Sequence, residues 1–123
     1  MSFVDCVNRG DVDGLSLLIA DDHTLQVLDE PPLVGRYANL DAWKEYLSAY
    51  PEYMIHVHDI AWSGDRVAVL GHTTGSHLAL PDDEESLLTV IWIGVDADGL
   101  LGRWQVYEDT PDHRERFGLS SAR

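Results

Sequence analysis

The chain has 123 residues, of which 45% are hydrophobic, and its 22 acidic and 8 basic side chains give a formal net charge of −14. This length is typical of one domain, residues 1–123, with a polar tail over 110–123. The acidic surface would repel phosphate groups, which excludes nucleic acid as a partner. No apolar run reaches the length of a membrane span and the first residues lack a signal-peptide pattern, so a cytoplasmic protein without a membrane partner is expected.

The first half of the chain predicts three helices and one strand. Apolar spacing favours a short helix at residues 2–7 and a second at 12–20, separated by Gly10. Residues 23–28 alternate as a strand whose apolar face continues to Asp29, and Pro31 and Pro32 end it. A third helix begins after residue 39 or 41, stops at Pro51, and carries a stripe of large side chains: Leu40, Trp43, Tyr46, Leu47 and Tyr50.

The second half has a period of two, which is typical of strands. Residues 54–62 and 66–77 form a hairpin; if Trp62 pairs with Arg66, then Asp59 and Thr73 share its apolar face. An acidic connection at 79–86 leads to a central strand at 87–95, and the turn Asp98-Gly99 to a last strand ending at Asp109. Three helices followed by antiparallel strands predict an α+β fold, with helices on one face of a curved sheet and a cone-shaped interior.

Several short motifs occur in an order that resembles the SnoaL-like branch of the nuclear-transport-factor-2-like superfamily. They are Asn8-Arg9-Gly10-Asp11, Ala20-Asp21-Asp22, Asp29-Glu30-Pro31, Val34-Gly35-Arg36, Gly64-Asp65-Arg66-Val67-Ala68-Val69, Gly75-Ser76-His77, Asp98-Gly99, Arg103-Trp104 and Tyr107-Glu108-Asp109. The resemblance implies a cone-shaped α+β barrel, a homodimer through the outer sheet face, and a pocket for a small hydrophobic or amphipathic organic molecule, with no cofactor. Members include polyketide cyclases, ketosteroid isomerase, limonene epoxide hydrolase, dehydratases and non-catalytic binding modules.

Three positions depart from the catalytic patterns of these relatives. Phe3 and Ile91 stand where the steroid isomerase carries its oxyanion-binding tyrosine and aspartic acid, and neither side chain donates a hydrogen bond. Val106 stands where the epoxide hydrolase and the cyclases carry an aspartate. Steroid isomerisation by that mechanism is therefore not expected, and other side chains have to supply any acid/base chemistry.

The resemblance and the strand parity together nominate three catalytic residues. Glu108 is the ionisable group on the inner face of the last strand, Asp29 ends the first strand, and His77 occupies a position where relatives carry a pocket histidine. Whether Asp29 or Glu30 faces the pocket stays open. The expected pocket lining is Trp43, Tyr46, Asp59, Thr73, Ile91, Trp104 and Val106.

Three histidines form a separate group on the hairpin. His56 and His58 lie on one side of a strand, with His72 expected opposite His56, which can form either a metal site or an interface. Because that face is the outer one, no metal is expected there. The leading hypothesis is a small-molecule isomerase, cyclase or hydrolase that uses general acid/base catalysis. The alternative is a ligand-binding or dimerisation module that has lost the family's acids.

Overall fold

The computed structural model describes residues 1–119, which form five helices and six strands. In chain order these are α1 (Ser2–Arg9), α2 (Val12–Ser16), β1 (Ile19–Val27), β2 (Leu33–Val34), α3 (Arg36–Ala49), β3 (Met54–Ser63), β4 (Arg66–Thr74), α4 (Asp82–Glu85), β5 (Val90–Ala97), β6 (Leu100–Glu108) and α5 (Pro111–Arg116). The strands form one sheet in the order β2-β1-β6-β5-β4-β3, in which only the β1–β6 pair is parallel.

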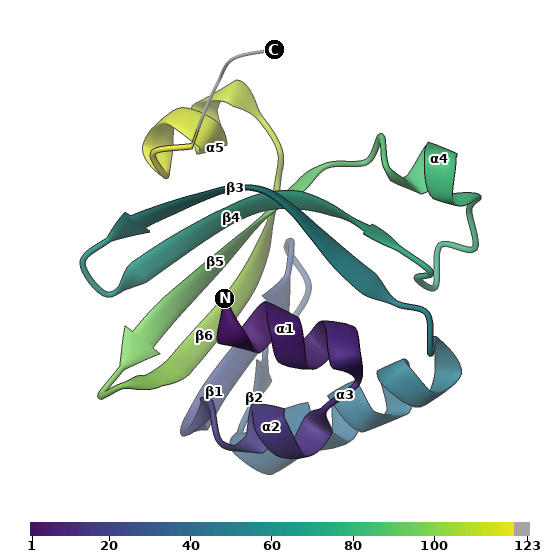
Figure 1. Cartoon of the computed structure of the whole chain (residues 1–123). Coiled ribbons are helices and arrows are strands. Elements are labelled where there is room, and N and C mark those ends of the chain that lie inside the picture. Colours follow the sequence, from purple (N-terminus) through teal and green to yellow (C-terminus); the bar gives the residue numbers. More distant parts are fainter. Residues whose placement is uncertain (120–123) are drawn as a thin grey trace.

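The predicted α+β architecture is confirmed. The sheet is curved, and α1, α2 and α3 lie on its concave face (Figure 1). Its two outer strands, β2 and β3, are not paired with each other, so the expected cone is an open sheet rather than a closed barrel. Among residues 1–119, none of the helices combines the length and apolar character that a membrane span requires.

Several elements differ from the sequence prediction. The second helix ends at Ser16 instead of residue 20, because Ile19 pairs with Leu101 and starts β1. The apolar stripe of 15–19 fits a helix and a strand equally well, and the neighbouring strand decides between them. Strand β2 and helix α4 lie in stretches that were expected to be loops, and part of the tail forms α5.

The hairpin turns follow the predicted positions. Asp98 and Gly99, with φ of 55° and 85°, connect β5 to β6 in the left-handed conformation that an Asp-Gly pair favours. In the β3–β4 hairpin the turn contains only Gly64 and Asp65, so Ser63 pairs with Arg66. The predicted pairing of residue 62 with residue 66 is therefore wrong by one position.

A β-bulge in β3 changes which side chains face the helices. Val57 pairs with Gly71 and Asp59 pairs with Leu70, so His58 is an extra residue between them. The bulge inverts the alternation of the strand, which places Asp59 on the outer face beside Leu70. Asp59 was expected in the pocket, and the bulge, which a period-two pattern does not reveal, is the reason that it lies outside.

The core lies between the helices and the inner face of the sheet. Trp104 of β6 is 1% exposed; its ring lies 4.7 Å from that of Phe3 in α1 and stacks on that of Trp92 in β5 at 6.4 Å. The other buried members of this cluster are Val4, Cys6, Val7, Leu15, Ile19, Trp43, Ile55, Val67, Val69 and Leu101. Helix α1 and the inner face of the sheet are therefore joined by a core of aromatic and aliphatic side chains.

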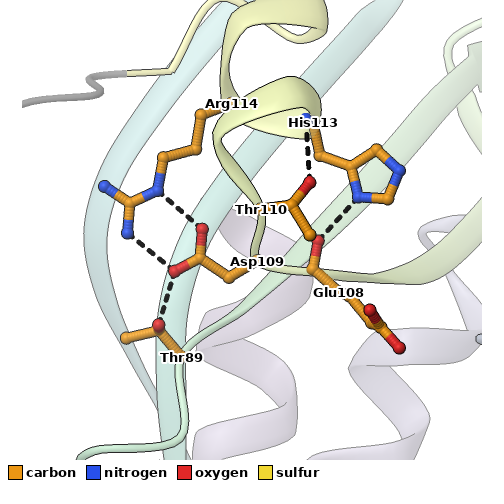
Figure 2. A network of polar contacts seen from close by, with 6 residues as sticks. All are labelled: Thr89, Glu108, Asp109, Thr110, His113 and Arg114. Atoms are coloured by element: carbon orange, nitrogen blue, oxygen red, sulfur yellow. Dashed lines mark hydrogen bonds and ion pairs between the residues drawn. The ribbon is translucent and has the colours of Figure 1, made fainter.

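Helix α5 and the residues after it cover part of the outer face. Phe117 and Leu119 are buried against Ala68, Leu70, Ile91 and Ile93. Asp109 accepts two hydrogen bonds of 2.6 Å from the Arg114 guanidinium and a third from the Thr89 hydroxyl (Figure 2). The bonds from Arg114 are the main reason that the pKa of Asp109 lies below its usual range. The predicted tail therefore docks up to Leu119, and its last four residues lie outside the described part of the chain.

His23 is a fully buried polar side chain of β1. Its Nδ1 lies 2.7 Å from the carbonyl oxygen of Leu101, so Nδ1 carries the proton and donates it there. Its Nε2 has no hydrogen-bond partner among residues 1–119. Burial lowers the pKa of His23, and the Leu101 carbonyl and the Asp22 carboxylate oppose that effect only partly. The imidazole is therefore neutral in the folded protein at pH 7.

We expect stability to fall in mild acid because of His23. The unfolded chain protonates this imidazole at a higher pH than the folded chain does. The free energy of unfolding should therefore decrease below about pH 6.5, by up to about 1.4 kcal/mol per pH unit for this one proton. Urea unfolding at pH 7.5 and 5.5 measures the effect. His23→Asn, whose amide can replace the Nδ1 donor, should be less stable at pH 7.5 but depend less on pH; equal pH dependence in both proteins would contradict the assignment.

Candidate functional site

Four aromatic side chains gather beside the start of β3 and the end of β4. Trp43 and Tyr46 project from one side of α3, because residues three apart share a helix face. Tyr50 caps the C-terminal end of α3, and Tyr53 immediately precedes β3. The ring of Tyr46 lies 6.4 Å from that of Trp43, 4.8 Å from that of Tyr50 and 5.0 Å from that of Tyr53. We call these four residues the aromatic cluster.

Tyr46 connects this cluster to His77. The Tyr46 hydroxyl oxygen lies 2.8 Å from His77 Nδ1, and it accepts a 3.2 Å hydrogen bond from the backbone N–H of His77. When the phenol proton is donated to Nδ1, the imidazole proton lies on Nε2. Burial raises the pKa of Tyr46, so its hydroxyl stays protonated at neutral pH.

Gly75 allows His77 to approach α3. Its φ is 67°, and a Cβ at this position would lie 2.5 Å from the carbonyl oxygen of Glu52. Only glycine accommodates both the left-handed conformation and this close approach. The Gly75-Ser76-His77 sequence therefore turns the chain after β4 so that the imidazole reaches Tyr46.

Glu85 is a buried carboxylate next to this cluster. It lies on α4, is 1% exposed, and its Oε2 accepts a 2.6 Å hydrogen bond from the hydroxyl of Thr73. Its Oε1 is also buried and has no hydrogen-bond partner in the described part of the chain. Burial is the main cause of the raised pKa of Tyr53, and the neighbouring Tyr46 and Glu85 raise it further. Glu85 also adds to the raised pKa of Tyr46.

Reasoning from the sequence missed Glu85 because the acidic stretch 79–86 resembles a solvated connection. One signal was available: Pro81 followed by four carboxylates is typical of a helix start, since acidic side chains are favoured in the first helical turn. That signal indicates a helix but does not say which of the four carboxylates turns inward.

The two nominated carboxylates, Asp29 and Glu108, lie together where the neighbouring strands β1 and β6 end. They line one hollow of about 290 Å³ with Leu28, Gln105, Val106, Tyr107 and His113, and Glu30 is not among its lining residues. Both carboxylates are exposed. His113 donates from Nδ1 to the backbone carbonyl of Glu108 at 2.7 Å, not to its carboxylate (Figure 2). The geometry brings Asp29 and Glu108 together, but in contact with water.

The expected pocket-lining residues divide between the two faces of the sheet. Trp104 and Val106 belong to the inner cluster, although Trp104 is covered by core neighbours. Thr73 is bound to Glu85, and Trp43 and Tyr46 form part of the aromatic cluster. Ile91 lies on the outer face against Phe117, because the even-numbered residues of β5 face inward. Its expected place in the pocket is therefore corrected.

The three hairpin histidines lie together on the outer face. His56 pairs with His72, as predicted, because the shorter turn and the bulge shift the register in opposite directions. His56 stacks on His72 at 4.6 Å, and His58 Nε2 lies 2.7 Å from His72 Nδ1. Burial, followed by the charges of His56 and His58, lowers the pKa of His72. Within residues 1–119 no three His, Cys, Asp or Glu side chains are grouped so that they could hold a metal ion.

Comparison with known domains identifies the family. Residues 2–111 match the profile of the SnoaL-like domain. The chain belongs to the SnoaL-like family. This result confirms the resemblance found in the sequence, and no curated protein sequence matches the chain.

Several solved structures share the fold of this chain. An uncharacterised cystatin-fold protein from Novosphingobium aromaticivorans is 15% identical, with a TM-score of 0.75 over 87% of this chain and 92% of that protein. A proposed polyketide cyclase from Sinorhizobium meliloti is 23% identical, with a TM-score of 0.70 over 86% and 90% of the two chains. An epoxide hydrolase from M. tuberculosis, similar to limonene epoxide hydrolase, is 15% identical, with a TM-score of 0.67 over 94% and 79%. At these identities the similarity establishes the fold and leaves the chemistry to the site.

Proposed function

We propose that this SnoaL-like protein binds a small, neutral, largely apolar organic molecule beside the aromatic cluster and acts on it by general acid/base catalysis. The reaction would be an isomerisation, cyclisation or hydrolysis in which side chains alone move the protons, with no cofactor. The observation that carries the proposal is the hydrogen bond between Tyr46 and His77, at the edge of a cluster of aromatic rings. Aromatic rings provide apolar contact area, and an imidazole is a side chain that can act as a general acid or base.

Each member of the pair has a distinct role in this proposal. His77 is exposed and presents Nε2 away from Tyr46, so it is one group that can exchange a proton with the ligand. Tyr46 fixes the tautomer of His77 through its hydroxyl. Asp29 and Glu108 remain proposed carboxylates at their own hollow, where they would act on a ligand long enough to extend from the inner face toward Val106.

The second candidate function is a binding module without catalysis. The observation in its favour is the set of departures from the catalytic patterns of relatives: Val106 replaces an aspartate, and the side chain of Phe3 donates no hydrogen bond. Incubation with neutral epoxides and 1,3-diketones, followed by mass spectrometry, separates the two functions. Turnover that is lost in His77→Gln supports the enzyme, whereas binding without turnover supports the module.

We expect the aromatic cluster to bind 2-naphthol, a neutral aromatic molecule with one hydroxyl group. Quenching of tryptophan fluorescence measures its affinity. Tyr46→Phe removes the hydroxyl that orients His77 and should weaken binding about tenfold, the equivalent of roughly one hydrogen bond. Trp62→Phe is the matched aromatic control, because Trp62 is 69% exposed on the β3–β4 hairpin. Equal affinity of the wild type and Tyr46→Phe would contradict the proposed site.

A homodimer and a cytoplasmic location are also part of this proposal. Phe117 and Leu119 occupy part of the outer face, so we propose that a second copy contacts the part that they leave open, around His56 and His72. Sedimentation equilibrium measures the mass of the particle in solution, and a monomer at micromolar concentration would contradict the homodimer.

A further inference from the structure

The segment between β4 and β5 places polar and apolar side chains in an unexpected way. Leu87 is 79% exposed and Leu88 is 49% exposed, yet the carboxylate of Glu85 in the same segment is buried. Its neighbours on α4, Asp82 and Glu84, are exposed. A segment selected only for packing would bury the leucines and leave all the carboxylates in water, since burial of a carboxylate costs free energy. The inward position of Glu85 therefore indicates a role other than packing.

The surroundings of Glu85 leave one oxygen available. Thr73 satisfies Oε2, and Oε1 has no partner among residues 1–119. Across the aromatic cluster, the indole N–H of Trp43 is also buried without a hydrogen-bond partner, and Trp43 is itself only 9% exposed. Glu85 Oε1, an acceptor, and Trp43 Nε1, a donor, are thus both buried without a partner in the described part of the chain. Tyr46 and Tyr53 connect them, because their rings contact that of Trp43 and Glu85 raises the pKa of both phenols.

We propose that Glu85 is the proton-accepting carboxylate of the site, and that its substrate is a neutral molecule carrying an acidic C–H next to a carbonyl group. This inference rests on the proposed function and names the residue and the substrate class for it. Oε1 would take the proton, and the electron pair left behind would move onto the carbonyl oxygen, where the N–H of Trp43 is available to stabilise it. The proton then returns from Glu85 to another atom of the same molecule.

The charge of the site sets the substrate class. The groups that interact with the Glu85 carboxylate are the Thr73 hydroxyl, the phenols of Tyr46 and Tyr53, and the imidazole of His72, whose pKa burial lowers, so none of them is a permanent cation. A substrate carboxylate or phosphate would therefore meet a buried negative charge without compensation. Because Oε1 is covered in the present conformation, the ligand reaches it when α4 moves aside, and Leu87 and Leu88 then offer apolar surface to the bound molecule.

The test uses 5-nitrobenzisoxazole, a neutral aromatic molecule that reports removal of a proton by a base. The base takes the C3 proton, the N–O bond breaks, and the oxygen leaves as a coloured cyanonitrophenolate, so no other reactant is consumed. We expect the purified protein to accelerate this reaction, and Glu85→Gln to lower the rate about 100-fold, the scale of a lost general base. Glu84→Gln, an exposed carboxylate on the same helix, should leave the rate within about twofold.

Binding of the same probe, measured by tryptophan fluorescence, separates this inference from the proposed function. Binding by both the wild type and Glu85→Gln, with a rate lost only in the variant, supports the role of Glu85. Equal binding and equal rates in the wild type and Glu85→Gln overturn the role of Glu85 and leave the proposed binding function intact. A rate that is lost only in Asp29→Asn or Glu108→Gln leads to the same conclusion. Failure of the wild type to bind the probe contradicts both. If Glu85→Gln does not fold, Glu85→Asp keeps the charge one methylene group farther away and should lower the rate at least tenfold.

Discussion

Replacement of Trp104 by alanine is expected to lower the free energy of unfolding by about 3–5 kcal/mol, the range measured for large aromatic side chains removed from a core. Trp104 is 1% exposed and lies between the ring of Phe3 on α1 and the stacked ring of Trp92 on β5. Its removal leaves a cavity that neither neighbour can fill without moving its own element. Urea unfolding followed by circular dichroism measures the loss, since tryptophan fluorescence changes with the substitution itself.

The matched control for this prediction is Trp62→Ala. Trp62 belongs to the same residue type but is 69% exposed at the β3–β4 turn, so its removal should change the free energy of unfolding by about 0.5 kcal/mol or less. A loss below about 1 kcal/mol for Trp104→Ala would show that α1 does not depend on this ring. The positions of Phe3 and Trp92 would then have to be fixed by other contacts.

The family resemblance, together with the alternation of the strand, assigned the faces of β6 correctly from Trp104 onward. Trp104 and Val106 face inward and Tyr107 faces outward, but Leu101 also faces inward, because Gly102 is an extra residue between the pairs Asp96–Leu101 and Val95–Arg103. The same reasoning failed for Asp59, since one extra residue at His58 reverses every side chain beyond it. Ile91 was assigned from the family resemblance, and that assignment conflicts with the parity of its own strand.

The candidate site was predictable where it depends on a helix and unpredictable where it depends on connections. The spacing of Trp43 and Tyr46 on α3 indicates a shared face directly. The contact of Tyr46 with His77, by contrast, depends on a turn at Gly75, and the burial of Glu85 depends on how a four-residue helix is held against Thr73. Pattern analysis finds elements with many repeated contacts, and these two features rest on single hydrogen bonds between distant parts of the chain.

Asn39 on α3 is a second position on which the fold depends. It is fully buried, and its side-chain Nδ2 lies 2.8–3.1 Å from three backbone carbonyl oxygens, those of His23, Leu33 and Gly35. The amide therefore holds the start of α3 against β1 and β2, where the backbone N–H of Gly35 also donates to the carbonyl of His23 at 2.9 Å. A donor at this point satisfies acceptors from three parts of the chain.

Asn39→Asp should therefore lower the free energy of unfolding at pH 7 by about 3–5 kcal/mol, because the carboxylate is buried, faces carbonyl oxygens and has no cation to compensate its charge. The buried carboxyl would take up its proton at a higher pH than the unfolded chain does. The deficit relative to the wild type should thus shrink as the pH falls toward about 4. Asp41→Asn is the matched control, the reverse exchange at an exposed position of the same helix, and should change stability by about 0.5 kcal/mol or less. Urea unfolding of the three proteins at pH 7 and 4.5 measures both effects, and a deficit that does not change with pH would contradict a buried charge as its cause.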